Sequence, residues 1–219
     1  MSLKSFAAPF AMALFFGLLS SAGRADAPKE DQEPPQTFFI EAGDKKIPVD
    51  LGQPFPTAEF AGKATATLRV DPHRTFRYAE LVFQYPQEFV FEADLENEAV
   101  SIWSLSGSNS VIMVQKYPGR KDADEVRKEV VRAMGDQYQE ALKSQSAVAL
   151  PLKSGNLQGV RLNVELAGSP LVQDLFSFTA GDCAIILLLQ DSPQENKQPS
   201  AEHAKAQKML TDSLSVPAK

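Results

Sequence analysis

Short segments in which apolar and polar residues alternate recur along most of this chain, and they constrain its fold more than any other feature. In 160–166 every second residue is Val or Leu, and the residues between them are polar. The same period of two occurs in 64–70, 79–85 and 89–94. Successive side chains of a β-strand point to opposite faces, so this period predicts strands that are buried on one face. We therefore expect an antiparallel sheet.

Turn-forming residues between such segments predict hairpins. Gly43-Asp44-Lys45 separates two strand candidates, and the polar run 106–110 separates another two. Pro86 suits the second position of a turn over 85–88, because its ring fixes φ. The apolar run 182–190 is long enough for a strand that is buried on both faces. It contains Cys183, the single cysteine, which is therefore expected to be a small apolar residue of the core.

Two segments have the spacing of helices. In Asp122–Ser144 apolar residues recur every three or four positions, and acidic residues in the first turn favour the positive end of the helix dipole. Ser200 is a suitable N-cap for a second helix over Ala201–Leu214. The order of elements predicts an α+β fold in which helices pack on the faces of an antiparallel sheet.

The N-terminus has the features of a secretory signal peptide. Lys4 precedes the apolar run Phe10–Leu19, and small residues follow this run. The run is about half as long as the ~20 apolar residues of a membrane-spanning helix, so we expect no transmembrane segment in the mature chain. Cleavage after Ala25 and cleavage after Ala27 both fit the small-x-small rule. We expect a signal peptide over 1–25, a flexible Pro-rich tether over 26–36 and a single domain over 37–219.

The charge balance argues against nucleic acid and anionic lipid as partners. The chain has 28 acidic and 22 basic side chains, for a net charge of −6. Removal of the signal peptide takes away Lys4 and Arg24 but no acidic residue. An acidic chain lacks the positive surface that phosphate groups require. We expect a periplasmic or extracellular protein with a protein partner.

The sequence has no recognisable catalytic or metal-binding motif. Neither His73 nor His203 has a second ligand at metal-binding spacing, and both are expected to be solvated. Ser106-Gly107-Ser108 lacks the strand–turn–helix setting of a nucleophile elbow. We therefore predict no catalytic residues, no metal and no cofactor. A hydrolase with a dispersed site near Asp71 and His73 is the alternative from the class of enzymes.

One cluster of basic residues stands out in this acidic chain and is a candidate contact for an acidic partner. Its members are Arg69, His73, Arg74 and Arg77. Pairing with local acids such as Asp71 and Glu80 is the alternative. Trp103 and Ile102 lie on opposite faces of a predicted strand. One of these two faces must be covered, by a helix of this chain or by a partner.

The run Phe83-Gln84-Tyr85-Pro86-Gln87-Glu88-Phe89 is followed by a hairpin, an amphipathic helix, further strands and a C-terminal helix. In this order the chain resembles the PsbP-like superfamily, which includes extrinsic photosystem II proteins and DcrB-type bacterial envelope proteins. The resemblance covers roughly 79–214 and leaves 37–70 unaccounted for. It implies an α/β/α sandwich with a non-enzymatic accessory role.

The expected function is a secreted, non-enzymatic binding or accessory module that acts on another envelope protein or complex. A carrier that encloses a small apolar ligand between the helix over 122–144 and the aromatic strands is a second alternative, besides the hydrolase.

Overall fold

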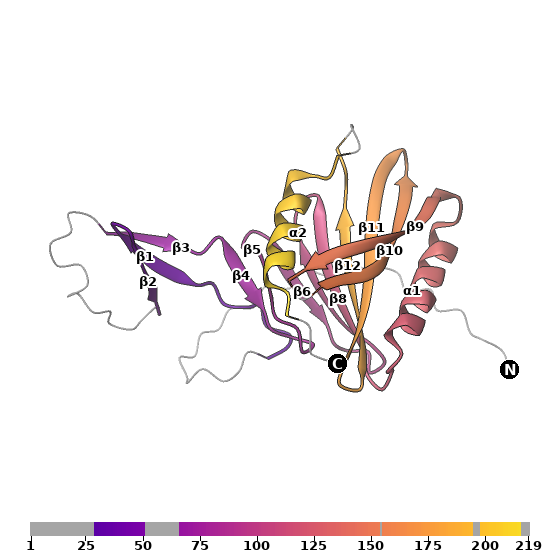
Figure 1. Cartoon of the computed structure of the whole chain (residues 1–219), viewed down its shortest axis with the longest axis horizontal. Coiled ribbons are helices and arrows are strands. Elements are labelled where there is room, and N and C mark those ends of the chain that lie inside the picture. Colours follow the sequence, from indigo (N-terminus) through magenta and orange to yellow (C-terminus); the bar gives the residue numbers. More distant parts are fainter. Residues whose placement is uncertain (1–28, 51–65, 154, 195–197, 216–219) are drawn as a thin grey trace.

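A computed structural model describes residues 29–50, 66–153, 155–194 and 198–215 of the chain (Figure 1). The predicted signal peptide over 1–25 and its two cleavage positions lie outside these residues. Of the described residues, 52% are in strands and 19% in helices. None of the helices in this part of the chain is both long enough and apolar enough to cross a membrane.

A seven-stranded antiparallel sheet forms the body of the molecule, in the order β6-β7-β8-β12-β11-β10-β9. Its strands are β6 (Val90–Asp94), β7 (Ser101–Ser106), β8 (Ser110–Tyr117), β9 (Leu142–Leu152), β10 (Gly155–Leu166), β11 (Ser169–Ala180) and β12 (Cys183–Asp191). The central strand β12 is buried on both faces, and Cys183 is a buried free thiol, as predicted. The predicted hairpin of β7 and β8 is confirmed.

Two helices cover opposite faces of this sheet. Helix α1 (Ala123–Tyr138) packs with one set of alternate β12 side chains, and helix α2 (Ala201–Ser213) shares a core cluster with the other set. The first set is Ala184, Ile186 and Leu188, and the second is Ile185, Leu187 and Leu189. Ser200 caps α2 as predicted, because its side chain accepts a hydrogen bond from the backbone N–H of His203.

The predicted α+β class with an α/β/α sandwich is wrong, because the described chain is a largely β fold in which α1 and α2 contribute only one helix to each face of the sheet. The helix predicted over 122–144 ends at Tyr138, since Gln139 has a φ of 49°. A short 3-10 turn follows, and β9 begins at Leu142. Residues after this point pair with β10, where Leu142 lies opposite Val164. Hydrogen bonding to a neighbouring strand thus overrides the local helical spacing.

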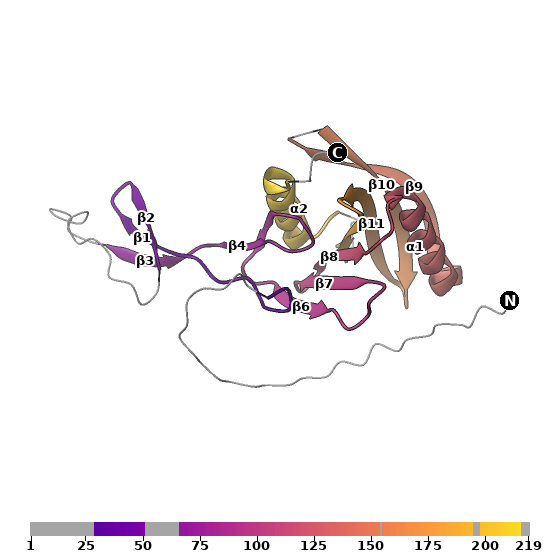
Figure 2. The same ribbon diagram turned by 90° about the horizontal axis from the view of Figure 1, so that it is seen from below.

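Two smaller sheets precede the body. β1 (Phe38–Ala42), β2 (Lys45–Val49) and β3 (Thr67–Val70) form an antiparallel sheet, hereafter the arm, that projects from the body in both views (Figures 1 and 2). The hairpin predicted at Gly43-Asp44-Lys45 is confirmed. All four residues of β3 are exposed, so its alternation does not reflect burial on one face.

A two-stranded sheet of β4 (His73–Phe76) and β5 (Phe83–Pro86) connects the arm to the body and lies against α2. The turn after β5 begins one residue later than predicted, because the N–H of Phe89 donates to the carbonyl of Pro86. The aromatic side chains of this region fill the larger core cluster, as the period of two indicated. The rings of Phe76 and Phe83 stack with centroids 4.7 Å apart.

Candidate functional site

The four basic residues that were predicted to form one cluster lie in different surroundings and contact different partners. Arg69 belongs to the arm, where its Nε lies 3.1 Å from Oε2 of Glu41. Arg77 is exposed, whereas Arg74 points inward and is 8% exposed. His73 contacts Asp71 and Gln84. The cluster therefore presents no common basic surface, and Arg74 is its buried member.

The Asp71–His73 pair, which the hydrolase alternative needs, does form. Nδ1 of His73 lies 2.7 Å from Oδ1 of Asp71, and Nε2 lies 2.8 Å from the amide nitrogen of Gln84. In this arrangement the carboxylate accepts from Nδ1–H and the other ring nitrogen accepts from the amide. Among the described residues, no hydroxyl is hydrogen-bonded to this ring, which is the contact that a nucleophile would make.

The prediction that His203 is solvated is wrong. Its side chain is buried, and its Nδ1 lies 3.1 Å from Oγ of Ser110. The neighbouring cap residue Ser200 donates from Oγ to Oδ1 of Asp191 at 2.6 Å. The Asp191 carboxylate therefore serves the helix cap, and these polar groups tie α2 to β8 and β12.

Trp103 is fully buried, and a segment of this chain covers it. Its Nε1 donates to the carbonyl of Glu30 at 2.7 Å. We call Lys29–Gln36 the strap; it lies within the predicted flexible tether and ends just before β1. The indole ring stacks on Tyr78, with an interplanar angle of 6°. The strap of this chain therefore covers Trp103.

Three side-chain donors hold three main-chain carbonyls of the strap at every second residue. Besides the bond from Trp103 to Glu30, the Tyr78 hydroxyl donates to the carbonyl of Gln32 at 2.5 Å. Nη1 of Arg74 lies 3.5 Å from the carbonyl of Pro34. We call Arg74, Tyr78 and Trp103 the strap-binding surface. All three contacts are therefore to main-chain carbonyls, which every peptide bond offers.

One side chain of the strap adds a charge contact. Nη1 of Arg74 also pairs with a carboxylate oxygen of Glu33, whose side chain is 47% exposed. The hydrogen bond to Glu33 raises the pKa of Arg74, and burial opposes this shift. The guanidinium therefore stays charged although it is almost fully buried.

Two buried polar atoms beside this ion pair have no hydrogen-bond partner among the described residues. They are Nε of Arg74 and the hydroxyl of Tyr85. Burial raises the pKa of Tyr85 to about 12, although the nearby Arg74 charge acts in the opposite direction. A buried donor without an acceptor is costly, so the surface has donor capacity that the strap leaves unused.

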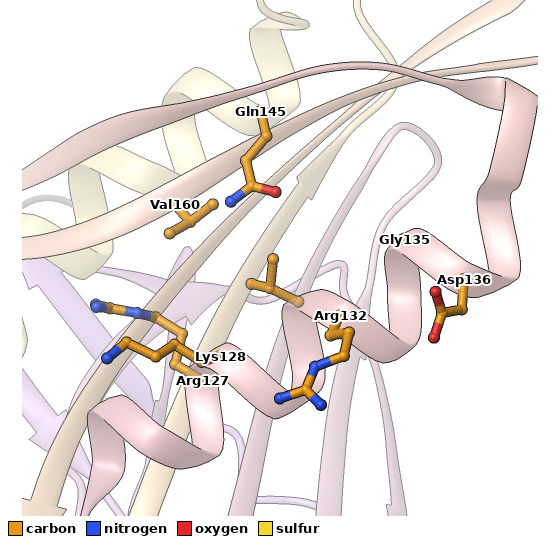
Figure 3. Close-up of a pocket in the computed structure, with 8 residues that line it drawn as sticks. Arg127, Lys128, Arg132, Gly135, Asp136, Gln145 and Val160 are labelled. Carbon is orange, nitrogen blue, oxygen red and sulfur yellow. The ribbon is translucent and has the colours of Figure 1, made fainter.

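A hollow of about 550 Å³ lies between α1 and the strands β9 and β10 (Figure 3). Its lining combines three cations of α1 with an apolar floor: Arg127, Lys128, Arg132, Val131 and Val160, beside Gln145, Gly135 and Asp136. Arg127 is already engaged, since it donates to the carbonyl of Gln158 and pairs with Asp124. The sheet separates α1 from the aromatic core, so the two do not enclose one cavity.

Metal chemistry finds no support in the described ranges, where no group of three His, Cys, Asp or Glu side chains could hold a metal ion. Sequence reasoning identified Arg74 and Trp103 but missed Tyr78, Glu33 and Pro34. The one available signal was the need to cover Trp103. The composition of the strap gave no sign that it packs on the body.

No family model matches the chain, and no curated protein matches it. A protein from Bacteroides thetaiotaomicron aligns over 68% of this chain and 50% of its own length, with 12% identity and a TM-score of 0.40. The chain thus spans about half the length of that protein. A protein of unknown function from Pseudomonas aeruginosa aligns over 68% of this chain and 99% of its own, with 15% identity and a TM-score of 0.35. Such distant likeness carries no argument, and the PsbP-like resemblance stays a prediction.

Proposed function

We propose that this chain is an exported, non-enzymatic binding or accessory module that acts on another envelope protein. The observation that carries the proposal is the row of donors from Trp103, Tyr78 and Arg74, which hold main-chain carbonyls of the strap. A surface that grips carbonyls at alternate residues suits a peptide segment. It offers no nucleophile and no acid–base pair to a substrate.

The residue types of the strap-binding surface also favour a role in binding. Trp, Tyr and Arg are the residues that most often dominate the energy of protein–protein interfaces, because they bury large rings and keep a directional donor. The acidic chain contributes a buried cation at this point, and a carboxylate is its natural partner. The partner is therefore expected to present an acidic peptide segment.

Capture of partners from the envelope of the native host tests the proposal. The mature chain is compared with Arg74→Met, which removes the buried cation, and with Arg77→Met, which removes an exposed one nearby. Wild type and Arg77→Met should retain the same stoichiometric partner, and Arg74→Met should retain at least tenfold less. Absence of any partner, together with esterase or peptidase turnover that His73→Ala abolishes, would contradict the proposal.

Export itself is tested by the intact mass of the protein from its native host. The proposal expects a mass that lacks the first 25 or 27 residues. A mass that retains the apolar run Phe10–Leu19 would refute export by cleavage.

A further inference from the structure

We propose that the strap-binding surface selects a partner segment in which proline directly follows an acidic residue, and that the strap is a resident occupant which this segment displaces. The inference rests on the proposed function and names the chemistry that the surface recognises. The strap supplies the pattern, because its Glu33-Pro34 step lies on Arg74.

The preference for a carboxylate follows from Arg74. The strap carries three other acidic or amide side chains before Glu33, yet in the described chain only the Glu33 carboxylate pairs with this guanidinium. An arginine that is 8% exposed needs a counter-charge, since an unpaired buried cation is destabilising. A segment without an acidic residue at this position would therefore bind poorly.

The preference for proline follows from what the surface offers. Trp103, Tyr78 and Arg74 all act as donors to the strap. Pro34 is buried at this point, and a proline has no backbone N–H that would need an acceptor. Any other residue would bring an additional N–H to this buried position, and the three hydrogen bonds that Arg74, Tyr78 and Trp103 make to the strap are all donated by the surface. Proline after the acidic residue therefore fits best.

In the described chain the strap leaves one buried donor of Arg74 without a partner, so a partner segment that uses this donor could displace the strap. It uses one nitrogen of Arg74, Nη1, for both the Glu33 carboxylate and the Pro34 carbonyl. The buried Nε has no partner in the described chain. A carboxylate that engaged the guanidinium in a two-pronged geometry would use this donor as well, and such pairs are stronger. The partner must also overcome the high effective concentration of a covalently attached competitor.

A labelled peptide tests this inference directly. The probe is fluorescein-labelled KEDQEPPQ, the sequence of residues 29–36, with an amidated C-terminus, titrated with the mature chain by fluorescence anisotropy. In the chain variant Glu33→Gln the competing strap loses its charge while Arg74 stays in place. This variant should bind the probe at least tenfold more tightly than wild type. The variant Glu30→Gln is the matched control and should bind as wild type does, because Glu30 contributes its carbonyl.

Changes in the probe provide the second arm. On the Glu33→Gln chain, a probe with Gln in place of Glu33 should bind at least tenfold more weakly, as should a probe with Ala in place of Pro34. A probe with Gln in place of Glu30 should bind unchanged. Arg74→Met should bind none of these probes better than wild type does.

Three results would overturn the inference. One is a Glu33→Gln chain with a native circular dichroism spectrum that binds the probe no better than wild type. Another is equal binding of the parent and substituted probes. The third is a wild-type dimer in sedimentation that Arg74→Met dissociates, because this would assign the surface to the strap of a second copy. If the probe fails while envelope capture still depends on Arg74, only the acidic-proline preference falls and the proposed function stands.

Discussion

The ion pair between Glu33 and Arg74 predicts unequal effects when either partner is removed. Glu33→Gln leaves an Arg74 side chain that is 10% exposed without its counter-charge, whereas Arg74→Met leaves a Glu33 side chain that is 47% exposed. Hydrogen bonds to charged groups contribute about 1.5–3 kcal/mol, and removal of one partner from a deeply buried pair costs about 3–5 kcal/mol. The half-exposed strap can lift and admit water, which places Glu33→Gln near the lower range, at about 2 kcal/mol.

Arg74→Met should reduce the free energy of unfolding by about 1 kcal/mol or less, because Glu33 then turns to water and only a long bond to the Pro34 carbonyl is lost. Urea unfolding, followed by circular dichroism and by the fluorescence of the single tryptophan, measures both changes. About 2 kcal/mol corresponds to a fall of roughly 4–8 °C in the melting temperature of a chain of this size. Glu30→Gln, as control, should stay within about 0.5 kcal/mol of wild type. A larger effect for Arg74→Met than for Glu33→Gln would refute the reasoning, as would equal effects of Glu33→Gln and Glu30→Gln.

Three further predictions concern the core. Burial raises the pKa of the Cys183 thiol, and its hydrogen bond to Asp182 adds to this shift, so a thiol reagent at pH 8 should label the chain only after denaturation; rapid labelling of native protein would show that the thiol is accessible. Tyr85→Phe should stay within about 1 kcal/mol of wild type at pH 7, because the lost hydroxyl lies near Arg74 but makes no hydrogen bond of good geometry in the described chain. The pKa of Tyr85 is about 12 in the folded chain and about 10 ordinarily, so wild type should lose stability as the pH rises from about 10 to about 12. The Phe variant has no such group and should lose less stability between pH 8 and 11. Equal losses in the two proteins would contradict this. Gly159→Ala should destabilise the fold by about 1–3 kcal/mol, because its Cβ would lie 2.5 Å from the carbonyl oxygen of Leu175. Gly135→Ala in α1 has room for the Cβ and should stabilise the fold by up to about 1 kcal/mol. Thermal unfolding of the two variants tests this ordering.

The sheet was predictable because its signals are local. The period of two in 160–166 and the turn residues at 106–110 act within a few positions, and both led to correct strands and a correct hairpin. The end of α1 was not predictable in this way. Apolar residues keep helical spacing past Tyr138, but pairing with a strand that follows later in the chain decides their structure.

The candidate site was predictable only in part. The alternation around Trp103 indicated that something must cover it, and Arg74 belonged to a conspicuous basic run. The covering segment was not identifiable, because Glu30 and Trp103 are 73 positions apart and a Pro-rich, charged segment has the composition of a free tether. The contacts of the strap arise from the folded body, and no pattern within the strap itself encodes them.

The Trp103 indole shows most directly whether the strap-binding surface holds peptide main chain. The chain has one tryptophan, so its Nε1–H gives a unique resonance whose exchange with solvent can be followed by nuclear magnetic resonance. In wild type this proton donates to the Glu30 carbonyl at 2.7 Å and should exchange slowly. In Glu33→Gln it should exchange at least tenfold faster, and addition of the unlabelled KEDQEPPQ peptide should restore slow exchange. Exchange in wild type at the rate of a free indole, or an exchange rate in Glu33→Gln that the peptide leaves unchanged, would contradict the account.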